Sequence, residues 1–471
     1  MGETLAVILT LTPTSGLTIL RLYLLEMEVN VDLIRAERIL IKKGHSNHAA
    51  CKRYCGAARI IYNAALYQMR QALFAEKPIS ASQADKILKR EHASIYQLLP
   101  SAGAQRTTQV LGDNWKGWIS SKKDYDKHPH KYKAKPRLPK YAKAAKTYVV
   151  GRNGHKIMDG KLFLASGNEF GFAPLSITCC KNQPYNSKAS ETIVNDVRIV
   201  PLGTAFMVEV IYRENIADPV KLNPENVFGI DLGINNLVTL ISTQQDVTPV
   251  LIKGKVIKSI NAKYNKLTAA LAANGKRAHI LSKSRKRYSQ INDYFHKVSY
   301  WLIEECLRTD TGKIVIGLNA DWKQSINIGR VNNQKFCFIP HARLIGMIRY
   351  KAERYGIEII VREESYTSKA SSLDLDVVPD YAKVKQSGVT VAFSGKRVKR
   401  GLYRSANGRH INSDVNGAAN ILRKEIGNEW LIAHLEAGKG VMDMPITVKH
   451  IDLLLEARPR PCETTSNREA A

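Results

Sequence analysis

Two acidic residues stand in sequence contexts that suit metal-dependent phosphodiester chemistry. Asp231 ends an apolar run, and a glycine-containing turn and a second apolar run follow it. Asp414 begins a helical pattern whose next turn holds the small residues Gly417, Ala418 and Ala419. Small residues let a helix lie close to a sheet, so the two carboxylates can share one site. Two-metal hydrolysis needs such carboxylates around ions roughly 3.5–4 Å apart.

The turn Gly229–Gly233 by itself leaves two classes of protein open. A strand that ends in Asp, a glycine turn and a second strand open the ribonuclease-H-like nucleases, but actin-like ATPases and sugar kinases open in a similar way. An ATPase needs a second Asp-x-Gly phosphate loop and a Gly-rich adenosine motif, and the sequence contains neither. Asp414 also has an ordinary alternative role, because Asp is a common helix N-cap.

The charge balance of the chain favours a nucleic-acid partner. The 471 residues include 71 Lys and Arg against 42 Asp and Glu, which gives a net charge of +29. An excess of this size indicates a polyanionic partner, and a merely basic surface is the alternative. The length suggests roughly two to four domains, and a hydrophobic content of 44% is sufficient for their cores.

The cysteines and the N-terminal segment indicate an intracellular protein without a membrane span. Seven cysteines are scattered over the chain, which is typical of a reducing compartment without a disulfide framework. The apolar residues 5–25 are interrupted by Pro13, Gly16 and Arg21, so they fit neither a signal peptide nor a spanning helix. We expect a cytoplasmic, nucleoid-associated bacterial protein that does not bind membranes.

The first half of the chain has strand patterns on both sides of a helical segment. Strand-like patterns occupy residues 27–43 and 147–223, whereas residues 48–127 have apolar side chains at three-to-four spacing. Ser82 is the expected cap of the second helix, and Pro100 ends that helix. We therefore predict a helical segment that is inserted into a small β barrel or sandwich.

The second half of the chain has an α/β pattern that positions the two acids. Two strands flank the turn after Asp231, and Gly and Asn in this turn suit a positive φ. A long basic helical pair follows at residues 256–310. Further strands at residues 313–316 and 356–364 precede the helix that begins at Asp414. We expect the strand of Asp231 to lie at the centre of the sheet.

Three stretches, found in one order, resemble regions of the TnpB family. They are Gly229–Gly233, Glu364–Lys369 and Ser413–Ile421. TnpB proteins are transposon-encoded, RNA-guided DNA endonucleases from which type V CRISPR effectors are thought to descend. The order and spacing of the motifs, together with the layout of the first half, extend the resemblance over residues 27–425.

The resemblance implies a RuvC-like DNA endonuclease. Its catalytic residues and metal ligands would be Asp231, Glu364 and Asp414, with Mg²⁺ or Mn²⁺ as the cofactor. Its partners would be a guide RNA, of transposon or CRISPR-like origin, and a target DNA with a short adjacent motif. The resemblance leaves open whether the protein is a monomer or a dimer.

The middle carboxylate departs from the usual family pattern. In most of the family the strand equivalent to residues 313–316 continues into Glu, but here Gly317 follows it. A subset of TnpB proteins and the Fanzor relatives use a Glu further along the chain, which corresponds here to Glu363 or Glu364. The spacing to the Tyr of the Tyr-Thr-Ser-Lys text selects Glu364, and Asp321 is a second candidate.

Two alternatives to a nuclease with a relocated Glu stay open at this point. A chain without a working middle carboxylate would be a nuclease-inactive, RNA-guided DNA-binding repressor. A DDE transposase shares the fold, but the Glu before the Tyr-Thr-Ser-Lys text, Glu364, argues against it. Arg362 and Lys369, near this Glu, suit either contacts to a nucleic-acid backbone or ordinary ion pairs.

The second departure is the absence of zinc-ribbon cysteines. Family members often read Thr-Ser-x-x-Cys-x-x-Cys after the Tyr, with a second Cys pair before the last Asp. This chain has no Cys between Cys337 and Cys462. Structural zinc needs four ligands at short spacing, so we predict no zinc. We expect residues 366–405 to form a basic hairpin or loop instead.

Basic residues in three segments are expected to contact nucleic-acid phosphates. The segments are the proline-interrupted stretch 122–146, the helical pair and the basic insertion, and a solvated surface is the alternative for the stretch 122–146 and for the insertion. The residues that we select are Lys131, Lys133, Lys135, Arg137, Arg285, Arg287, His296, Lys297, Lys396, Arg397 and Arg400. A reader of the target-adjacent motif is expected in the helical segment, where a core-flanking role is the alternative. Its candidates are Tyr54, Asn63, Tyr67, Gln68, Arg70, Gln105 and Gln109.

The patterns and the resemblance together predict an α+β multidomain protein. A β-barrel-like wedge domain with an inserted helical recognition lobe would precede an RNase H-like (RuvC) α/β domain. The predicted boundaries are 1–26 for an N-terminal extension, 27–47 and 128–225 for the wedge domain, 48–127 for the helical domain, 226–365 and 406–430 for the nuclease domain, 366–405 for the basic insertion and 431–471 for a C-terminal tail.

Overall fold

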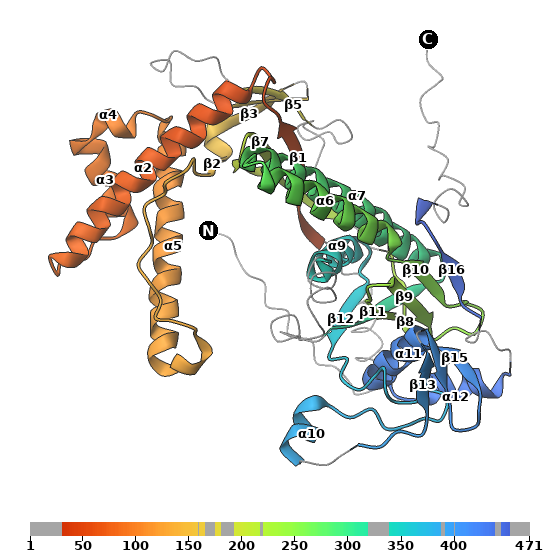
Figure 1. Cartoon of the computed structure of the whole chain (residues 1–471). Helices are drawn as coiled ribbons and strands as arrows, with labels where there is room; N and C mark the ends of the chain where they lie inside the picture. Colours follow the sequence, from red (N-terminus) through yellow and green to blue (C-terminus); the bar gives the residue numbers. More distant parts are fainter. Residues whose placement is uncertain are drawn as a thin grey trace, which may run out of the picture. The chain divides into compact units, whose positions relative to one another are not determined.

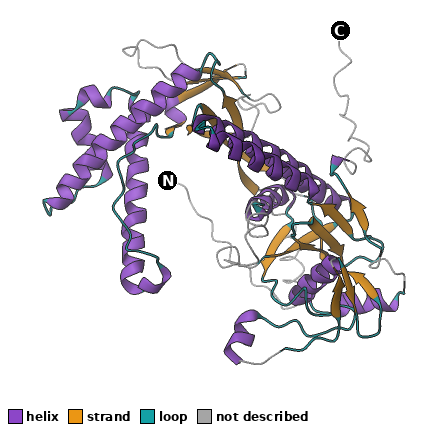
Figure 2. Cartoon of the chain, viewed as in Figure 1, coloured by secondary structure: helices purple, strands orange, loops and turns teal. Residues whose placement is uncertain are grey.

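The computed structural model describes residues 31–158, 160–164, 175–179, 193–216, 220–318, 339–387, 391–399, 401–438 and 444–452. The predicted N-terminal extension, the end of the predicted tail, Asp321 and Arg400 lie outside these residues. The chain folds into two compact units, Met1–Ala217 and Asp218–Ala471. Both units combine helices and strands (Figure 2), so the predicted α+β class is confirmed.

The first unit consists of two antiparallel sheets and a helical segment (Figure 1). Its elements are β1 (Val31–Ile41), α2 (His48–Phe74), α3 (Ala81–Glu91), α4 (Ala93–Tyr96), α5 (Ser101–Lys127), η1 (Pro129–Lys131), β2 (Tyr148–Gly151), η2 (Arg152–Gly154), β3 (His155–Met158), β4 (Lys161–Leu164), β5 (Ser176–Thr178), β6 (Ile193–Leu202) and β7 (Ala205–Ile216). The strand orders are β1-β7-β6-β2 and β3-β4-β5. β1 pairs with β7 along its whole length, and helices α2 to α5 lie in the sequence between β1 and β2, the two edge strands of this sheet. The described strands form two separate sheets, and a closed barrel stays a prediction.

Helix α2 and the larger sheet of this unit share one hydrophobic core. Tyr54 of α2 stacks on Tyr148 of β2, with ring centroids 4.9 Å apart. The buried residues of α2 recur at helical spacing and include Tyr54, Ala58, Ile61, Ala65 and Met69. This helical face therefore packs as the three-to-four spacing predicts.

The cap of helix α3 differs from the prediction. Ser80, not Ser82, is the N-cap. Its hydroxyl accepts a hydrogen bond from Gln83 N (3.2 Å), and Gln83 Oε1 accepts one from Ser80 N (2.8 Å). This reciprocal pair is a capping box. Two nearby serines fit the same sequence signal, which explains the error of two positions.

The second unit is built around a six-stranded sheet with the order β12-β11-β8-β9-β10-β16. Its elements are β8 (Asn223–Asp231), β9 (Asn236–Ser242), β10 (Val250–Lys253), α6 (Lys255–Ala273), α7 (Arg277–Arg308), β11 (Thr311–Gly317), α9 (His341–Ala352), η3 (Glu353–Tyr355), β12 (Glu358–Arg362), α10 (Tyr381–Ser387), β13 (Lys396–Lys399), β14 (Leu402–Arg404), β15 (His410–Asn412), α11 (Ser413–Ile426), α12 (Glu429–Glu436) and β16 (Ile446–Val448). β8 lies at the centre, antiparallel to β9 and parallel to β11.

The prediction of a C-terminal tail over residues 431–471 is partly wrong. Helix α12 buries Leu431 against α11, and β16 pairs in parallel with β10 at the edge of the sheet. Val448 and Ile451 are buried in the sheet's core. The three-residue strand β16 is too short to give a periodic signal, so the sequence pattern did not reveal it.

Consecutive residues of the central strands face opposite helical layers. On β8, Ile230 packs with α7 and α9, whereas Val227 packs with α11. Gly229 also faces α11, because a Cβ there would lie 2.4 Å from Leu422 Cγ. Side chains of a strand alternate between its two faces. The last residue of β8, Asp231, therefore points to the α11 face.

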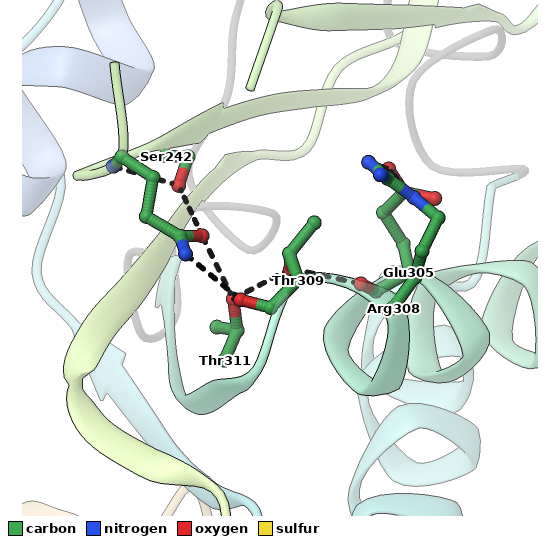
Figure 3. A network of polar contacts seen from close by, with 6 residues as sticks. Ser242, Glu305, Arg308, Thr309 and Thr311 are labelled. Carbon is green, nitrogen blue, oxygen red and sulfur yellow. Dashed lines mark hydrogen bonds and ion pairs between the residues drawn. The ribbon is translucent and has the colours of Figure 1, made fainter. Parts of the chain in front are cut away.

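A polar network holds the end of the sheet that lies opposite Asp231 (Figure 3). Thr309 Oγ1 donates a hydrogen bond to Glu305 O (2.9 Å) and lies 2.8 Å from Thr311 Oγ1. Gln244 Nε2 donates to Thr309 O (2.8 Å), and Gln244 N donates to Ser242 Oγ (3.0 Å). The network ties the end of α7 and the start of β11 to the end of β9.

Helices α6 and α7 form the long antiparallel pair that the sequence predicts (Figure 1). Arg287 Nε of α7 donates a hydrogen bond to Asn261 Oδ1 of α6 (2.7 Å), and Tyr264 and Ser284 hydroxyls lie 2.7 Å apart. In the sequence, the pair lies between strands β10 and β11. Despite their length, neither these nor the other helices of the described residues are apolar enough to span a bilayer.

Candidate active site and nucleic-acid interface

Asp231 lies at the end of β8, directly against helix α11. A Cβ on Gly417 would lie 2.9 Å from Asp231 Oδ2, so only glycine lets the helix approach the carboxylate this closely. Ala418 and Ala419, the next residues of α11, are fully buried in the core under the sheet. The cluster of small residues thus has the packing role that the sequence predicts.

Glu364 follows β12, the edge strand that pairs with β11. It reaches the same face of the sheet as Asp231. β12 ends at Arg362, which is paired with Gly317 of β11. A Cβ on Gly317 would lie 3.1 Å from Glu364 Oε2 and 2.3 Å from Ile421 Cδ1. The Glu364 carboxylate therefore stands beside the place that a side chain at position 317 would occupy.

Asp414 lies in the first turn of α11, but it does not cap the helix. Asn412 is the N-cap, and its Oδ1 accepts a hydrogen bond from Asp414 N (2.9 Å). Asp414 Oδ2 accepts a hydrogen bond from Asn236 Nδ2 (2.6 Å), and Asp414 Oδ1 lies 3.6 Å from Arg397 Nη2. The capping alternative is therefore excluded, and the Asp414 carboxylate faces β9 and the basic insertion.

The three carboxylates influence one another electrostatically. Burial raises the pKa of Asp231 well above its usual range, and the charges of Glu364 and Asp414 raise it further. The guanidinium of Arg397 acts in the opposite direction. A carboxylate that is buried beside two others is in an environment that favours a proton or a cation.

The donor set is chemically suited to Mg²⁺ or Mn²⁺, which prefer carboxylate oxygens. The side chains do not yet form a cage, because no three Asp, Glu, His or Cys residues in the described part of the chain are arranged around a metal position. Asp414 accounts for this, since its oxygens face Asn236 and Arg397. A divalent cation would relieve the repulsion that raises the pKa of Asp231. The residues therefore fit the group by chemistry, and their role as ligands stays a prediction.

Asn236 and Lys253 belong to the site, although sequence reasoning did not select them. None of Gly233, Asn235 and Asn236 adopts the positive φ that these residue types tolerate. Asn236 begins β9, is buried, and donates to Asp414, while its Oδ1 accepts a hydrogen bond from Lys253 Nζ (2.8 Å). An Asn at the start of an otherwise apolar strand was the available signal.

The structure separates the two candidates for the middle carboxylate. Glu363 Oε2 lies 2.8 Å from Lys424 Nζ, and Glu363 Oε1 accepts a hydrogen bond from Ser365 N (3.1 Å). Although burial opposes it, these bonds lower the pKa of Glu363. Glu363 is therefore engaged with α11, whereas Glu364 is the residue beside Asp231. Arg362 is an ion-pair partner, 2.7 Å from Glu425.

The basic insertion contributes β13 and β14 to a three-stranded sheet, β13-β14-β15, whose third strand follows the insertion, and a carboxylate organises the insertion. Ser371 and Asp374 stand where the Cys-x-x-Cys motif of the family has its cysteines. Asp374 Oδ2 accepts hydrogen bonds from Ser371 Oγ (2.5 Å), Ser394 Oγ (3.1 Å) and Ala406 N (2.8 Å). Although burial opposes it, these bonds lower the pKa of Asp374. Tyr403 adds a bond to Lys369 O (2.7 Å).

Two of the three basic segments present cations to solvent. In the proline-interrupted stretch, Lys133, Lys135 and Arg137 are exposed, and Lys131 lies 3.7 Å from Asp124. In the insertion, Lys396 is exposed, whereas Arg397 donates a hydrogen bond to Ser413 Oγ (2.9 Å) beside Asp414. Contact of these residues with nucleic acid stays a prediction.

The candidates on the helical pair are more involved in internal contacts. Arg287 is bonded to Asn261 and lies over the ring of Tyr264, 5.2 Å from its centroid. Lys297 Nζ lies 3.0 Å from Asp452 Oδ1, which ties α7 to the C-terminal segment. His296 is exposed, and its Nδ1 lies 3.2 Å from Tyr350 Oη. Arg285 is half-buried on the same helix.

Some of the candidates for a motif reader make internal contacts, and others are exposed. Tyr54 is fully buried, so its selection as a reader was wrong. Asn63 bonds both backbone groups of Ala142, and Gln68 lies 3.1 Å from His92, which gives both residues a structural role. The candidates that keep exposed side chains include Tyr67, Gln105 and Gln109. Arg70 stacks over Phe74 and Tyr141.

Solved structures with low sequence identity resemble the chain. A cryo-EM structure of a Cas12f1–sgRNA–target DNA complex has 13% identity and a TM-score of 0.45, over 79% of this chain and 81% of that chain. A CRISPR-Cas12f ternary complex has 14% identity and a TM-score of 0.31, over 79% and 80%. The mini-RNA-guided endonuclease CRISPR-Cas_phi3 has 10% identity and a TM-score of 0.40, over 87% and 95%. No curated protein matches the chain.

Two protein families match consecutive parts of the sequence. Residues 206–323 match OrfB_IS605, described as a probable transposase. Residues 341–421 match the Cas12f1-like TNB domain. The first match contains the Gly229–Gly233 motif, and the second contains both of the later motifs. Over these two ranges the sequence resembles TnpB-like proteins, and the resemblance predicted from its motifs is confirmed.

Proposed function

We propose that the chain is an RNA-guided DNA endonuclease. A guide RNA would pair with the target DNA, the first unit would read a short motif beside the target, and the sheet of the second unit would form an RNase H-like (RuvC) nuclease domain. The strand order supports this assignment, because β8, β9 and β10 are antiparallel neighbours while β11 and β12 continue the sheet in parallel on the other side of β8.

One observation carries the proposal: Glu364 and Asp414, from two distant parts of the sequence, both act electrostatically on the buried Asp231. Asp231 contacts α11 at Gly417, Glu364 lies beside Gly317, and the charges of Glu364 and Asp414 both act on Asp231. Such a cluster costs stability through mutual repulsion. A bound cation would offset this repulsion, so the cluster is consistent with a cation-binding function.

The three carboxylates would hold Mg²⁺ or Mn²⁺, which when bound supplies activation of a water and neutralisation of charge on the leaving oxygen. Asn236 donates to Asp414 and fixes the orientation of its carboxylate. Arg397 lies beside Asp414 with 48% of its side chain exposed, so it can contact both this acid and a phosphate from solvent. The guanidinium would thereby orient the DNA backbone at the acids.

Nucleic-acid binding would rest on the positive charge of the chain. The net charge is +29, and exposed cations lie in the stretch 131–137 and in β13. Proteins that bind guide–target duplexes contact the backbone and leave the reading of sequence to base pairing. We therefore assign guide RNA and target DNA as the partners, and a nucleoid-associated location follows from them.

A nuclease-inactive, RNA-guided repressor is the second candidate. Gly317 lacks the usual carboxylate, and Asp414 faces Arg397 rather than a metal position. A repressor would use the same nucleic-acid contacts without hydrolysis. It differs from the endonuclease in a single property, the metal-dependent cutting of bound DNA.

The test uses the purified full chain with the RNA that co-purifies with it. The RNA would be sequenced, and a plasmid that carries the matching target would be supplied with Mg²⁺. The endonuclease predicts cut plasmid with Mg²⁺ and intact plasmid with EDTA. Guide-dependent binding that leaves the plasmid intact in Mg²⁺ and in Mn²⁺ would favour the repressor. Absence of both binding and cutting would contradict both functions.

A further inference from the structure

The ammonium group of Lys424 is buried among oxygen atoms at the end of strand β12. Only 4% of its side chain is exposed. Nζ lies 2.8 Å from Glu363 Oε2 and donates to the backbone oxygens of Glu363 (3.4 Å) and Ser365 (3.0 Å). Asp380 Oδ1 lies 3.8 Å away. A buried ammonium is costly unless hydrogen-bond acceptors surround it, and here they do.

The two backbone oxygens that accept from Lys424 flank Glu364 in the chain. The carbonyl of residue 363 precedes Glu364, and the carbonyl of residue 365 follows it. One ammonium group therefore holds the backbone of the residue before Glu364 and of the residue after it. A further bond, from Thr367 Oγ1 to Glu364 O (2.8 Å), closes the turn that follows.

Glu364 needs such support because it lies beyond the regular sheet. β12 is an edge strand that ends at Arg362, so no ladder of backbone hydrogen bonds continues to residue 364. A metal ligand at the end of a central strand is held by its neighbours on both sides. A ligand placed two residues beyond an edge strand depends on contacts from elsewhere, and α11 provides them through Lys424.

We infer that Lys424 is a positioning residue for Glu364, and that helix α11 sets two of the three carboxylates at once. Its first turn carries Asp414, and its last turn carries Lys424. The helix thus couples the position of Asp414 to that of Glu364. Glu363 serves this arrangement as the charge partner of Lys424. The inference rests on the proposed function, since it assigns Glu364 to the metal site.

The test measures Mn²⁺ binding by electron paramagnetic resonance on the full chain, freed of RNA and treated with a chelator beforehand. Lys424→Met removes the ammonium and keeps the apolar stem. Loss of a residue that orients a metal ligand costs about 10- to 100-fold in metal affinity, so the variant is expected to bind Mn²⁺ at least about tenfold more weakly. Lys383→Met is the matched control, because Lys383 also pairs with Asp380 (3.6 Å) but is 83% exposed.

Cleavage by the guide-loaded protein gives a second readout. A positioning defect in Lys424→Met should be largely overcome by raising the Mn²⁺ concentration, whereas a general loss of structure would not respond to metal. If Lys424→Met does not fold, Glu363→Ala decides instead, because Glu363 is half-buried and its loss removes the charge partner that holds the Lys424 ammonium against the two carbonyls. We expect Glu363→Ala to weaken Mn²⁺ binding several-fold.

The outcomes separate this inference from the proposed function. If Asp231→Asn abolishes Mn²⁺ binding while Lys424→Met, or in its place Glu363→Ala, binds Mn²⁺ like the wild type, the positioning role is overturned and the metal site stands. If Asp231→Asn binds Mn²⁺ as tightly as the wild type, the metal site itself is wrong, and the role of Lys424 fails with it.

Discussion

Asp231 is held in a position that destabilises its charged form. Its pKa is raised first by burial and then by the two neighbouring carboxylates. Between the unfolded pKa of about 3.9 and the raised folded value, the folded protein binds more protons than the unfolded chain. Stability from this group is therefore fully present below the unfolded pKa and is lost as the pH rises through the folded pKa.

The first prediction follows for Asp231→Asn, which keeps the shape and removes the charge. In metal-free buffer at pH 8 the variant should melt at a higher temperature than the wild type. Its free energy of unfolding should be larger by roughly 1.4 kcal/mol for each unit by which the pKa of Asp231 is raised. This gain should shrink toward pH 4. Calorimetric melting curves at several pH values measure this. A variant that is less stable than the wild type at pH 8 would show that Asp231 is not under strain.

Gly317 supplies the second prediction. A Cβ there would press on Ile421 and on the Glu364 carboxylate, so Gly317→Ala should cost roughly 1–3 kcal/mol of stability through overpacking and should also lower cleavage. Gly346→Ala is the control, because Gly346 lies in helix α9 and nothing stands within 4 Å of the place that an alanine methyl would occupy. It should be neutral or stabilising by about 0.5–1 kcal/mol. Equal melting temperatures for the two variants would contradict the crowding at Gly317.

At the scale of elements, helix α11 joins the six-stranded sheet to the insertion. Asn416 Nδ2 donates to Ala370 O (2.8 Å), and Asn420 Nδ2 donates to Thr367 O (2.8 Å) and to Ala370 O (2.7 Å). Asn416 and Asn420 are both fully buried. Their bonds satisfy backbone oxygens of the segment that follows Glu364, so this segment is set by the helix and not by a strand partner.

The third prediction concerns the insertion, where Asp374 bridges separate segments. Asp374→Ala leaves the buried hydroxyl of Ser371 without its acceptor, at about 1–3 kcal/mol, and removes a bond to the exposed amide of Ala406. Hydrogen exchange should therefore quicken in β13 to β15, while Glu436→Ala, an exposed control, leaves it unchanged. Because the pKa of Asp374 is lowered, its contribution is present above about pH 3.9 and is lost as the pH falls through the lowered pKa. Unchanged exchange in Asp374→Ala would refute its bridging role.

How far the elements could be predicted depends on their local signals. The strands predicted at residues 313–316 and 356–364 are found as β11 (Thr311–Gly317) and β12 (Glu358–Arg362), because apolar runs between turn residues are a local signal. β16 was missed because its three residues carry no period. Glu364 could be selected over Glu363 only through a family motif. Asn236 gave only a weak local signal, an Asn at the start of a buried strand, because its partner Asp414 is 178 residues away.

At the scale of the whole molecule, the excess of positive charge should dominate nucleic-acid affinity. Each phosphate contact contributes about 0.7 to 0.9 to the slope of log affinity against log salt. The fourth prediction is that replacing Lys133, Lys135 and Arg137 together with Ala lowers this slope for guide RNA by roughly two to three. Binding titrations over a range of salt concentrations measure it. Lys383→Ala is the control, and an unchanged slope in the triple variant would assign the stretch to a solvated surface.

The central claim is that Asp231 and Glu364 together serve metal-dependent DNA cleavage. The most direct measurement is the rate of Mg²⁺-dependent cutting of a guide-matched plasmid by Glu364→Gln and Asp231→Asn. Glu358→Gln serves as the control, because Glu358 begins β12, the strand that precedes Glu364. The Glu358 side chain is 58% exposed and pairs with Lys313. We predict that both site variants lose more than roughly 100-fold in rate, beyond the range of residues that merely support a ligand, while the control cuts like the wild type. A Glu364→Gln variant that cuts at the wild-type rate would contradict the account.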